Sequence, residues 1–407
     1  MKALRLSPIA LLLAFAGALP AAESGAIDVE RCVLAIAQKL AAYDAAQPVK
    51  TAYPNEAKGA KWATVPAKDW VSGFYPGALW YTYEFAKRRN WPDQEAWRQR
   101  ADLWTAGLTK EQFTTTNHDL GFMLMDSFGH AYRLTGEPRY KAVVLQAAKS
   151  LAKRYRPEVG LIRSWGAIDD MKEFTVIIDN MMNLELLMWA STHEGSNQDG
   201  TAQDLRKIAI SHADHATQDF FRPDGSTYHV VELNPLTGAV LRKHTAQGKA
   251  DDSCWSRGQT WAIYGFAAMY EATKDRKYLE QSLKAADYYL AHLPADHVPP
   301  SDFNSTLTGL EFTDSSAAAI ACCAFFRISR LSDDPAIRTR FRQAAIDTLR
   351  SLTRAPYFSD SPDKASALLY QARNYSPDAN NRLTNTSLIW GDYYLLEALL
   401  AYDASQS

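Results

Sequence analysis

The fold is decided by one segment, residues 261–293, which reads WAIYGFAAMYEATKDRKYLEQSLKAADYYLAHL. Its first part, residues 261–270, is apolar on nearly every side of a helix, and such a helix is buried. The part from Tyr278 onward is amphipathic, which predicts an outer helix with one solvent-facing stripe. The polar turn EATKDRKY (271–278) joins the two helices into a hairpin.

The same hairpin recurs along the chain at a period of about sixty to seventy residues. Two further turns, RLTGEPRY (133–140) and RLSDDPAI (330–337), each end one helix and start another. A repeated helical unit of this length indicates an array. Apolar residues at three- and four-residue spacing predict twelve helices, at 28–45, 74–90, 93–108, 119–135, 138–155, 178–193, 202–220, 258–274, 277–293, 315–332, 337–355 and 388–403.

The first helix of each pair is apolar nearly all round, and the second is amphipathic. Six buried helices inside six amphipathic ones describe a closed double ring of hairpins, an all-α (α/α)6 barrel. A two-domain helical solenoid is the alternative, but no linker rich in Pro, Gly or Ser divides the chain. We therefore expect a single catalytic domain over residues 23–407. The segment STYHVVEL (226–233) predicts a small strand hairpin within a long loop.

The N-terminus has the layout of a secretory signal peptide. Lys2 and Arg5 precede an apolar run over residues 9–19, and the small residues Ala21 and Ala22 follow. We expect residues 1–22 to be removed and the protein to be exported, to the periplasm if the source is Gram-negative. Removal would change the formal charge from −2 to −4, which does not suit nucleic-acid binding. No other segment has the apolar length of a membrane span.

Aromatic residues are abundant, with 11 Trp, 20 Tyr and 16 Phe, and they suit both a large core and stacking on sugars. The four cysteines fit small buried hydrophobes best, and a disulfide between Cys32 and Cys254 stays open.

Polar and aromatic residues concentrate in the segments that lead into the apolar helices. Asp119, Asp179 and Asp314 stand there, and each of them could also be a helix N-cap. Capping does not explain the other residues gathered at the same ends, which are Trp70, His118, Trp255, Arg257 and Trp261. In a ring of hairpins these ends surround one cavity. Aromatic walls, carboxylates and a guanidinium predict a site for a polar, planar, anionic ligand.

Other constellations are weaker, and we predict no metal and no cofactor. His212 and His215 could share a metal, but a solvated helix face is the better interpretation because no third ligand is evident. The pairs Asp169–Asp170 and Asp251–Asp252 lack the regularly spaced oxygen ligands of a calcium loop. His229 is either a solvent-facing strand residue or a site residue delivered by a loop.

At these segments the sequence resembles the unsaturated glucuronyl hydrolases of glycoside hydrolase family 88. The resemblance covers nearly all of the chain after the N-terminal segment. The motifs that carry it are DW-x-x-GF (69–74), HDLGF (118–122), IIDNMMNLELLMWA (177–190), DGS-x-YH (224–229), W-x-RGQ-x-WAIYGF (255–266), DSSAAAI (314–320) and IWGDYY (389–394).

The resemblance implies the (α/α)6 fold and assigns roles to residues. Asp179 matches the general acid/base, and Asp119, after His118, matches the second essential carboxylate. The substrate-binding set would be Trp70, His118, His229, Gln247, Arg257 and Trp261. Ala246 departs from the family, whose members often have His before the Gln. The rival unsaturated rhamnogalacturonyl hydrolases of family 105 lack the carboxylate equivalent to Asp119.

The implied reaction is hydration of the C4=C5 double bond that polysaccharide lyases leave on a uronic acid. Asp179 would protonate C4 and then activate water, and Asp119, ionised, would stabilise the cation. Asp179 must then start protonated: a helix N-terminus lowers its pKa, whereas burial beside Met181 and Met182 and the charge of Asp119 raise it.

Alternatives from other classes are an exported oligosaccharide-binding protein without catalysis, an inverting glycosidase of saturated sugars, and a lyase. The partner we expect is a small acidic oligosaccharide. The sequence leaves the parent polysaccharide and the oligomeric state open.

Overall fold

The computed structural model of the chain describes residues 26–193, 201–378, 380 and 384–406. The predicted signal peptide, residues 1–22, lies outside the described residues. All twelve predicted helices are present within the described parts of the chain, with ends that differ by a few residues. None of the described helices is long and apolar enough to cross a membrane.

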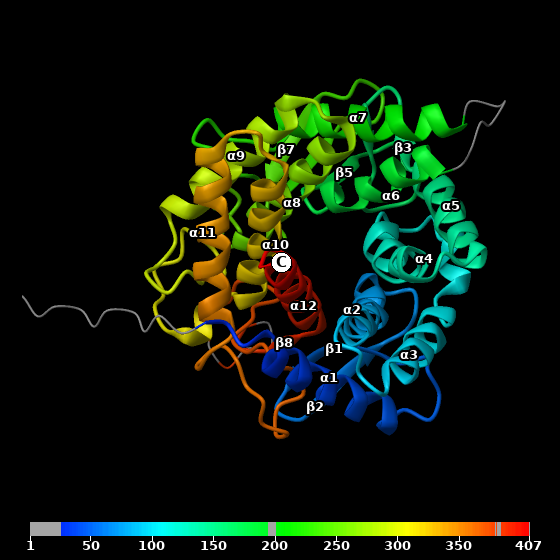
Figure 1. Ribbon diagram of the computed structural model, residues 1–407. Coiled ribbons are helices and arrows are strands. Elements are labelled where there is room, and N and C mark those ends of the chain that lie inside the picture. The colour runs from blue at the N-terminus through cyan, green and yellow to red at the C-terminus, as the bar shows by residue number, and fades with distance from the viewer. Residues whose placement is uncertain (1–25, 194–200, 379, 381–383, 407) are drawn as a thin grey trace, which may run out of the picture.

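The helices form two concentric rings (Figure 1). The inner ring consists of α2 (Phe74–Arg88), the segment η3 (Gly121–Gly129) with α4 (His130–Thr135), α6 (Asn180–His193), α8 (Ser256–Thr273), α10 (Ser315–Leu331) and α12 (Ile389–Ala404). The outer ring consists of α1 (Val29–Ala46), α3 (Gln94–Ala106), α5 (Pro138–Ala152), α7 (Thr201–Asp219), α9 (Arg276–Ala291) and α11 (Pro335–Leu352). Each inner helix contacts the next, and α12 contacts α2, so the ring closes. The predicted (α/α)6 barrel is confirmed.

One inner element differs from the prediction. The helix expected at 119–135 begins as the π-helical segment η3 and becomes α-helical only at His130. The first amide groups of η3, those of Gly121 and Phe122, donate to Oδ1 of Asn183 at 2.8 and 3.2 Å. A Cβ on Gly121 would lie 2.6 Å from that oxygen, so glycine is needed for this close approach. A segment that is apolar nearly all round has no polar stripe that reveals its number of residues per turn, and the sequence could not separate the two helix types.

The helix pairs are joined by turns of two kinds. In the turns after α4 and α8 a left-handed residue ends the helix, with φ 72° at Gly136 and φ 61° at Lys274. In both turns that residue donates its amide to a carbonyl one turn back, which ends the helix. The third similar sequence differs, because Ser332 after α10 is extended.

Short strands lie between the helices in three small sheets. Their bounds are β1 Tyr53–Lys58, β2 Lys61–Val65, β3 Tyr155–Arg156, β4 Leu161–Ile162, β5 Phe174–Ile177, β6 Val230–Leu233, β7 Val240–His244 and β8 Ser387–Leu388. The strand expected within 226–233 is β6, which pairs with β7 as a hairpin and also with β5. The amide of Ile178, just after β5, donates to the carbonyl of His229 at 3.0 Å. This pairing places His229 beside Asp179.

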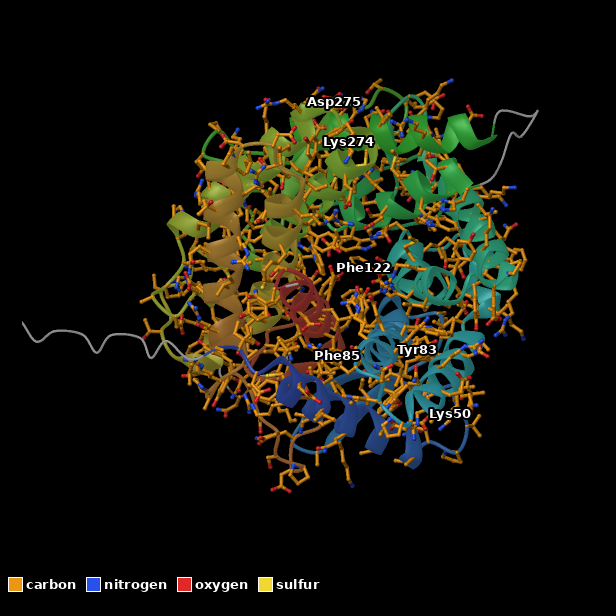
Figure 2. All side chains as sticks on the ribbon, viewed as in Figure 1. Lys50, Tyr83, Phe85, Phe122, Lys274 and Asp275 are labelled. Atoms are coloured by element: carbon orange, nitrogen blue, oxygen red, sulfur yellow. The ribbon has the colours of Figure 1, made fainter. Side chains whose placement is uncertain are left out.

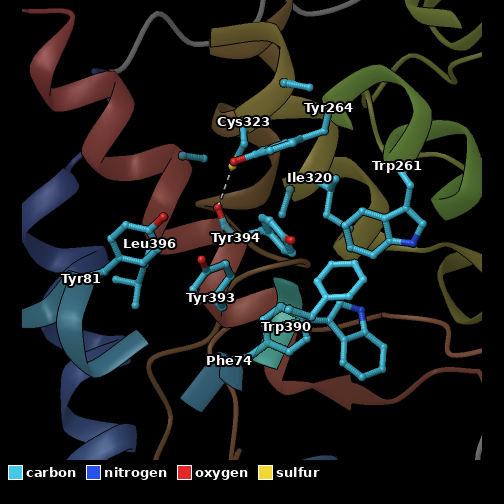
Figure 3. Close-up of a cluster of buried hydrophobic side chains, with 14 of the residues drawn as sticks. Phe74, Tyr81, Trp261, Tyr264, Ile320, Cys323, Trp390, Tyr393, Tyr394 and Leu396 are labelled. Atoms are coloured by element: carbon cyan, nitrogen blue, oxygen red, sulfur yellow. Dashed lines mark hydrogen bonds between the residues drawn. The ribbon is translucent and has the colours of Figure 1, made fainter. Parts of the chain in front are cut away.

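Aromatic side chains fill the middle of the ring. Phe122, near the centre in Figure 2, lies 5.2 Å from Trp261 and 5.7 Å from Phe74, measured between ring centroids. Trp390 and Tyr394 of α12 complete this cluster (Figure 3). Phe74, Phe122 and Trp390 are the first or second residues of their inner elements, so the cluster lies just inside the end where these elements begin. All four cysteines are buried free thiols, so Cys32 and Cys254 form no disulfide.

Candidate active site

A cavity of about 310 Å³ opens at the ends where the inner helices begin. Six of the eight predicted site residues line it, which are Trp70, His118, Asp119, Asp179, Gln247 and Arg257. The other two, His229 and Trp261, lie in the layer behind its wall. The six lining residues come from the starts of four inner elements, α2, η3, α6 and α8, or from the loops just before them. The ring geometry predicted that they would meet at one place. The lining also includes Trp165, Ile177, Ala246, Arg373 and Asn374.

Asp179 lies between β5 and α6, and only 7% of it is exposed. Burial raises its pKa to about 7, although the guanidinium of Arg257, a backbone amide and the indole of Trp261 lower it. In the competition between the helix N-terminus and burial, burial wins. Asp179 therefore holds a proton for a substantial part of the time at neutral pH.

Asp119 stands just before η3, with its Oδ1 atom 3.3 Å from Nε2 of His118. Burial first, and then the charges of Asp179 and Asp69, raise its pKa to about 8, although Arg154 lowers it. The sequence analysis expected Asp119 to be ionised and to raise the pKa of Asp179. Instead, the pKa values of both carboxyl groups are raised. Because two desolvated negative charges disfavour each other, the pair retains a proton near neutral pH.

The two histidines beside these acids are neutral. Burial lowers the pKa of His118 and of His229 to about 3 each. Nδ1 of His229 accepts the backbone amides of Ala246 and Gln247 at 3.1 and 3.3 Å, so its proton is on Nε2. His229 is 3% exposed, and its ring lies 4.5 Å from that of Trp255. The solvent-facing interpretation of His229 is therefore wrong, and the residue is buried beside Asp179.

Arg257 is 1% exposed, and its guanidinium makes three hydrogen bonds to other protein groups. Its Nη1 atom donates to Oδ2 of Asp314 at 2.9 Å and to the carbonyl of Ala372, and its Nη2 atom donates to the carbonyl of Arg373 at 2.6 Å. The guanidinium lies 4.5 Å from the ring of Trp255. These bonds use three of the five N–H donors of the guanidinium, and its Nε atom has no partner among the described residues, so Nε and the second N–H of Nη2 remain for a ligand.

Asp314 also has a structural role. It caps α10, accepting the amides of Ser316 and Ala317 at 3.1 and 3.3 Å, and its other oxygen binds Arg257. Of the three aspartates that were candidate caps, Asp314 is the cap. Asp251, considered above for a calcium loop, contacts Arg242 across 3.4 Å.

The segment 372–375 brings two further residues into the cavity that the sequence analysis missed. Nε2 of Gln247 donates to the carbonyl of Arg373 at 3.1 Å and to Oδ1 of Asn374 at 3.2 Å. Gln247 and Arg257 together hold this segment against the cavity. The Arg373 side chain is 34% exposed, and its ion pair with Glu56 spans 3.4 Å. No periodicity marks this irregular segment, so no sequence pattern could have indicated its role.

Two tryptophans differ from the expectation. Trp165, missed by the sequence analysis, is 38% exposed at the cavity, and its ring is perpendicular to that of His229 at 6.3 Å. Trp261 is fully buried and does not line the cavity; its indole lies next to Asp179. Trp165 is thus an open stacking surface, whereas Trp261 supports the acid from behind.

The histidines considered as metal ligands have another explanation. Nδ1 of His212 accepts the amide of Ile162 at 3.0 Å, and the residue is 1% exposed. The predicted solvated face is therefore wrong for His212, which satisfies a backbone amide in the core. Within the described parts of the chain, no group of three or more His, Cys, Asp or Glu side chains could hold a metal ion.

A closed ring of helical hairpins with two proton-sharing carboxyl groups in an aromatic-walled cavity defines an (α/α)6 glycoside hydrolase. The sequence model of Glycosyl Hydrolase Family 88 matches residues 44–325, and the chain belongs to this family. It is a hydrolase of unsaturated uronic acid sugars. This membership decides against the non-catalytic binding protein and the lyase.

Several relatives are similar over most of their length. An unsaturated glucuronyl hydrolase of Formosa agariphila is 36% identical over 82% of this chain and 80% of its own. An unsaturated chondroitin disaccharide hydrolase of Streptococcus pyogenes is 30% identical over 87% and 86% of the two chains. A solved unsaturated glucuronyl hydrolase specific for heparin is 32% identical, with a TM-score of 0.81, over 93% of this chain and 97% of its own. That of Bacillus sp. strain GL1 has a TM-score of 0.82 at 29% identity, over 92% and 97% of the chains.

Proposed function

We propose that this enzyme releases the C4=C5 unsaturated uronate from the non-reducing end of small acidic oligosaccharides by hydrating the double bond, with Asp179 as acid and base. The observation that carries the proposal is the burial of Asp179 beside Asp119 in a cavity of about 310 Å³, where burial raises the pKa of Asp179 to about 7. A carboxylic acid that is still protonated near neutral pH can donate to a weak carbon base, which an ordinary exposed Asp cannot do.

The substrate double bond is an enol ether, because the ring oxygen is attached to C5. The proton of Asp179 moves to C4 as the π electrons form the new C4–H bond, leaving positive charge on C5 and the ring oxygen. Water then adds to C5 and gives its proton to the Asp179 carboxylate, which restores the acid. The resulting hemiketal opens without further catalysis and releases the neighbouring sugar.

Asp119 stabilises the charged intermediate in this scheme. While both acids face a neutral double bond, the charge on one raises the pKa of the other, which keeps a proton available. Once C5 is cationic, a negative charge on Asp119 becomes favourable, because the cation lies in the same desolvated cavity. The neutral His118 lies beside this carboxylate, with Nε2 3.3 Å from Oδ1 of Asp119.

The remaining cavity residues are suited to recognition of the sugar. Arg373 is the partly exposed cation of the cavity, and we assign to it the uronate carboxylate or a sulfate on the next sugar. Trp70 and Trp165 offer aromatic faces for the apolar sides of the rings. Ala246 stands where relatives often have histidine, so contacts on that side differ from those of the family pattern.

Export is part of the proposal. It rests on the sequence of residues 1–22, which has the charge and apolar run of a signal peptide. An exported enzyme would meet oligosaccharides made outside the cell by polysaccharide lyases.

The test is turnover of lyase-generated unsaturated disaccharides beside their saturated counterparts, with and without sulfate. The proposal predicts release of the second sugar from the unsaturated compounds alone. Equal hydrolysis of the saturated compounds would identify ordinary glycosidase chemistry and contradict the proposal.

A further inference from the structure

Arg154 is a buried cation to which the proposed chemistry gives no role. It follows the outer helix α5, it is 1% exposed, and it does not line the active-site cavity. Among the described residues, no carboxylate lies within ion-pair distance of its guanidinium. A buried charge without a counter-charge is costly, so the hydrogen bonds of Arg154 must offset that cost.

All of these hydrogen bonds go to backbone carbonyls. The Nε atom of Arg154 donates to the carbonyl of Arg163 at 2.7 Å. Its Nη2 atom donates to the carbonyls of Ser164 and Gly166 at 3.2 and 3.0 Å, and its Nη1 atom donates to the carbonyl of Thr115. One planar group with diverging donors thus binds two segments that are far apart in the sequence.

The first of these segments carries Trp165, the exposed stacking surface of the cavity. The carbonyls on either side of this residue, those of Ser164 and Gly166, are the two that Nη2 binds. Gly166 has a left-handed φ of 84°, which turns the chain directly after Trp165. The hydroxyl of Ser164 also accepts the amide of Ile177 at 3.0 Å, two residues before Asp179. The position of the stacking ring therefore depends on this guanidinium.

The second segment leads to the other carboxyl group of the pair. Thr115 stands four residues before Asp119, and between them Oδ1 of Asn117 accepts the amide of Asp119 at 3.0 Å. Because the chain between the bound carbonyl and the acid is this short, a shift of the contact between Arg154 and Thr115 would move the carboxyl group.

Arg154 also acts on Asp119 through its charge. Burial, together with the charges of Asp179 before α6 and Asp69 before the short helix of residues 70–73, raises the pKa of Asp119. The neighbouring His118 is neutral because burial lowers its pKa to about 3. Arg154 is the cation that opposes these effects and lowers the pKa of Asp119.

We propose that Arg154 is a positioning residue of the active site, which holds the turn of Trp165 against the segment of Asp119 and supplies positive charge behind that acid. This inference rests on the proposed function, in which a negative Asp119 stabilises the cationic intermediate. Arg257 lowers the pKa of Asp179 in the same way. Each acid thus has one buried arginine that favours its carboxylate form.

The kinetics of Arg154→Gln on an unsaturated disaccharide test the proposal. The substitution keeps a planar polar group but removes the charge and most of the donors. We expect kcat to fall by about tenfold or more, because the cationic intermediate loses stabilisation. Loss of a nearby positive charge raises the pKa of Asp119, so the decline of kcat/KM at high pH should move upward by about half a pH unit or more.

Arg163→Gln is the matched control. Arg163 is also 1% exposed and braces the same turn, with Nη1 and Nη2 donating to the carbonyls of Glu173 and Asp170 at 2.6 Å each. Its charge does not affect the pKa of Asp119. This variant should unfold at a lower temperature, as Arg154→Gln should, but it should keep the pH midpoint of the wild type. An equal shift in both variants, or a wild-type midpoint and kcat in Arg154→Gln, overturns the proposal.

Arg154→Lys decides if Arg154→Gln does not fold. Lysine keeps the charge, but its donors share one atom and cannot reach carbonyls on both sides. We expect a midpoint close to that of the wild type and a KM raised about tenfold, because Trp165 loses its support. An unchanged KM, or failure of both variants to fold, would assign Arg154 to the stability of the barrel alone. If the wild type does not turn over the unsaturated disaccharide, the proposed function itself fails.

Discussion

The Nε2 atom of His229 lies 3.7 Å from Oδ2 of Asp179. Because the other ring nitrogen accepts the amides of Ala246 and Gln247, the N–H of His229 faces the carboxyl group. A neutral donor in this position leaves the acid its proton in the resting enzyme, and it stabilises the carboxylate that forms when the proton moves to the substrate. The loop that carries Gln247 is thereby bound to His229, which lies next to the acid.

The pH dependence of the rate should report the ionisation of Asp179. Asp179 acts only while protonated, and its pKa is raised to about 7. We expect kcat/KM to fall about tenfold per pH unit at pH values above this pKa, with the exact midpoint set jointly by Asp119 and Asp179. Initial rates from pH 4 to 9 measure the profile. A rate that stays level to pH 9 would assign the proton to another group.

Asp179→Asn should abolish turnover while leaving the fold and substrate binding intact. General acid–base catalysis contributes ~10²–10⁴-fold in general, and here it is the whole chemical step. The pKa of Asp179 is raised from 3.8 in the unfolded chain to about 7 in the folded chain, so stability is lost as the pH rises from about 4 to about 7 and is level above that. The variant should therefore unfold at the same or a higher temperature than the wild type at pH 8.5, with the difference vanishing at pH 4.

Substrate binding to Asp179→Asn is measured by calorimetry on the unsaturated disaccharide. A well-folded variant with near-normal turnover would show that another residue is the proton donor, and Asp119 would be the first candidate. A variant that unfolds at a much lower temperature at both pH values would show that Asp179 is needed mainly for stability.

Substitutions of two arginines should both raise KM but should differ in their effect on stability. Arg257→Lys loses the contacts to Asp314 and to the carbonyls of 372–373, so we expect a lower unfolding temperature together with a higher KM. Arg373→Gln removes a partly exposed charge, so we expect a KM raised about tenfold with an unchanged unfolding temperature. If Arg257→Lys is fully stable and only KM rises, the guanidinium contacts the substrate directly, as the sequence alone suggested.

Activity should survive exhaustive chelation. The proposed chemistry needs a proton and a water, both handled by Asp179, and no Lewis acid. Turnover is compared before and after treatment with a chelator and gel filtration. A loss that one divalent ion restores would show that a metal takes part.

The sequence predicted the ring and most of the site because both depend on local patterns. Helical periodicity revealed the hairpins, and the polar residues before each apolar helix had to meet at one end of a closed ring. Three features depended on contacts that no local pattern encodes. They are the π-helical form of η3, the use of Arg257 as a brace for residues 372–375, and the approach of Arg373 to the cavity. The proton shared by Asp119 and Asp179 depends on their burial together, which only the fold determines.

The central claim is that the proton of Asp179 goes to carbon, and product formed in heavy water tests it most directly. Hydration of the double bond must place deuterium at C4 of the released keto-uronate, on one face only at early times. Ordinary glycoside hydrolysis protonates the bridging oxygen and leaves every carbon–hydrogen bond of the sugar unchanged. Finished product incubated in heavy water controls for slow exchange next to the new ketone. One deuterium at C4 in early product supports the account, and complete turnover with no deuterium at C4 would contradict it.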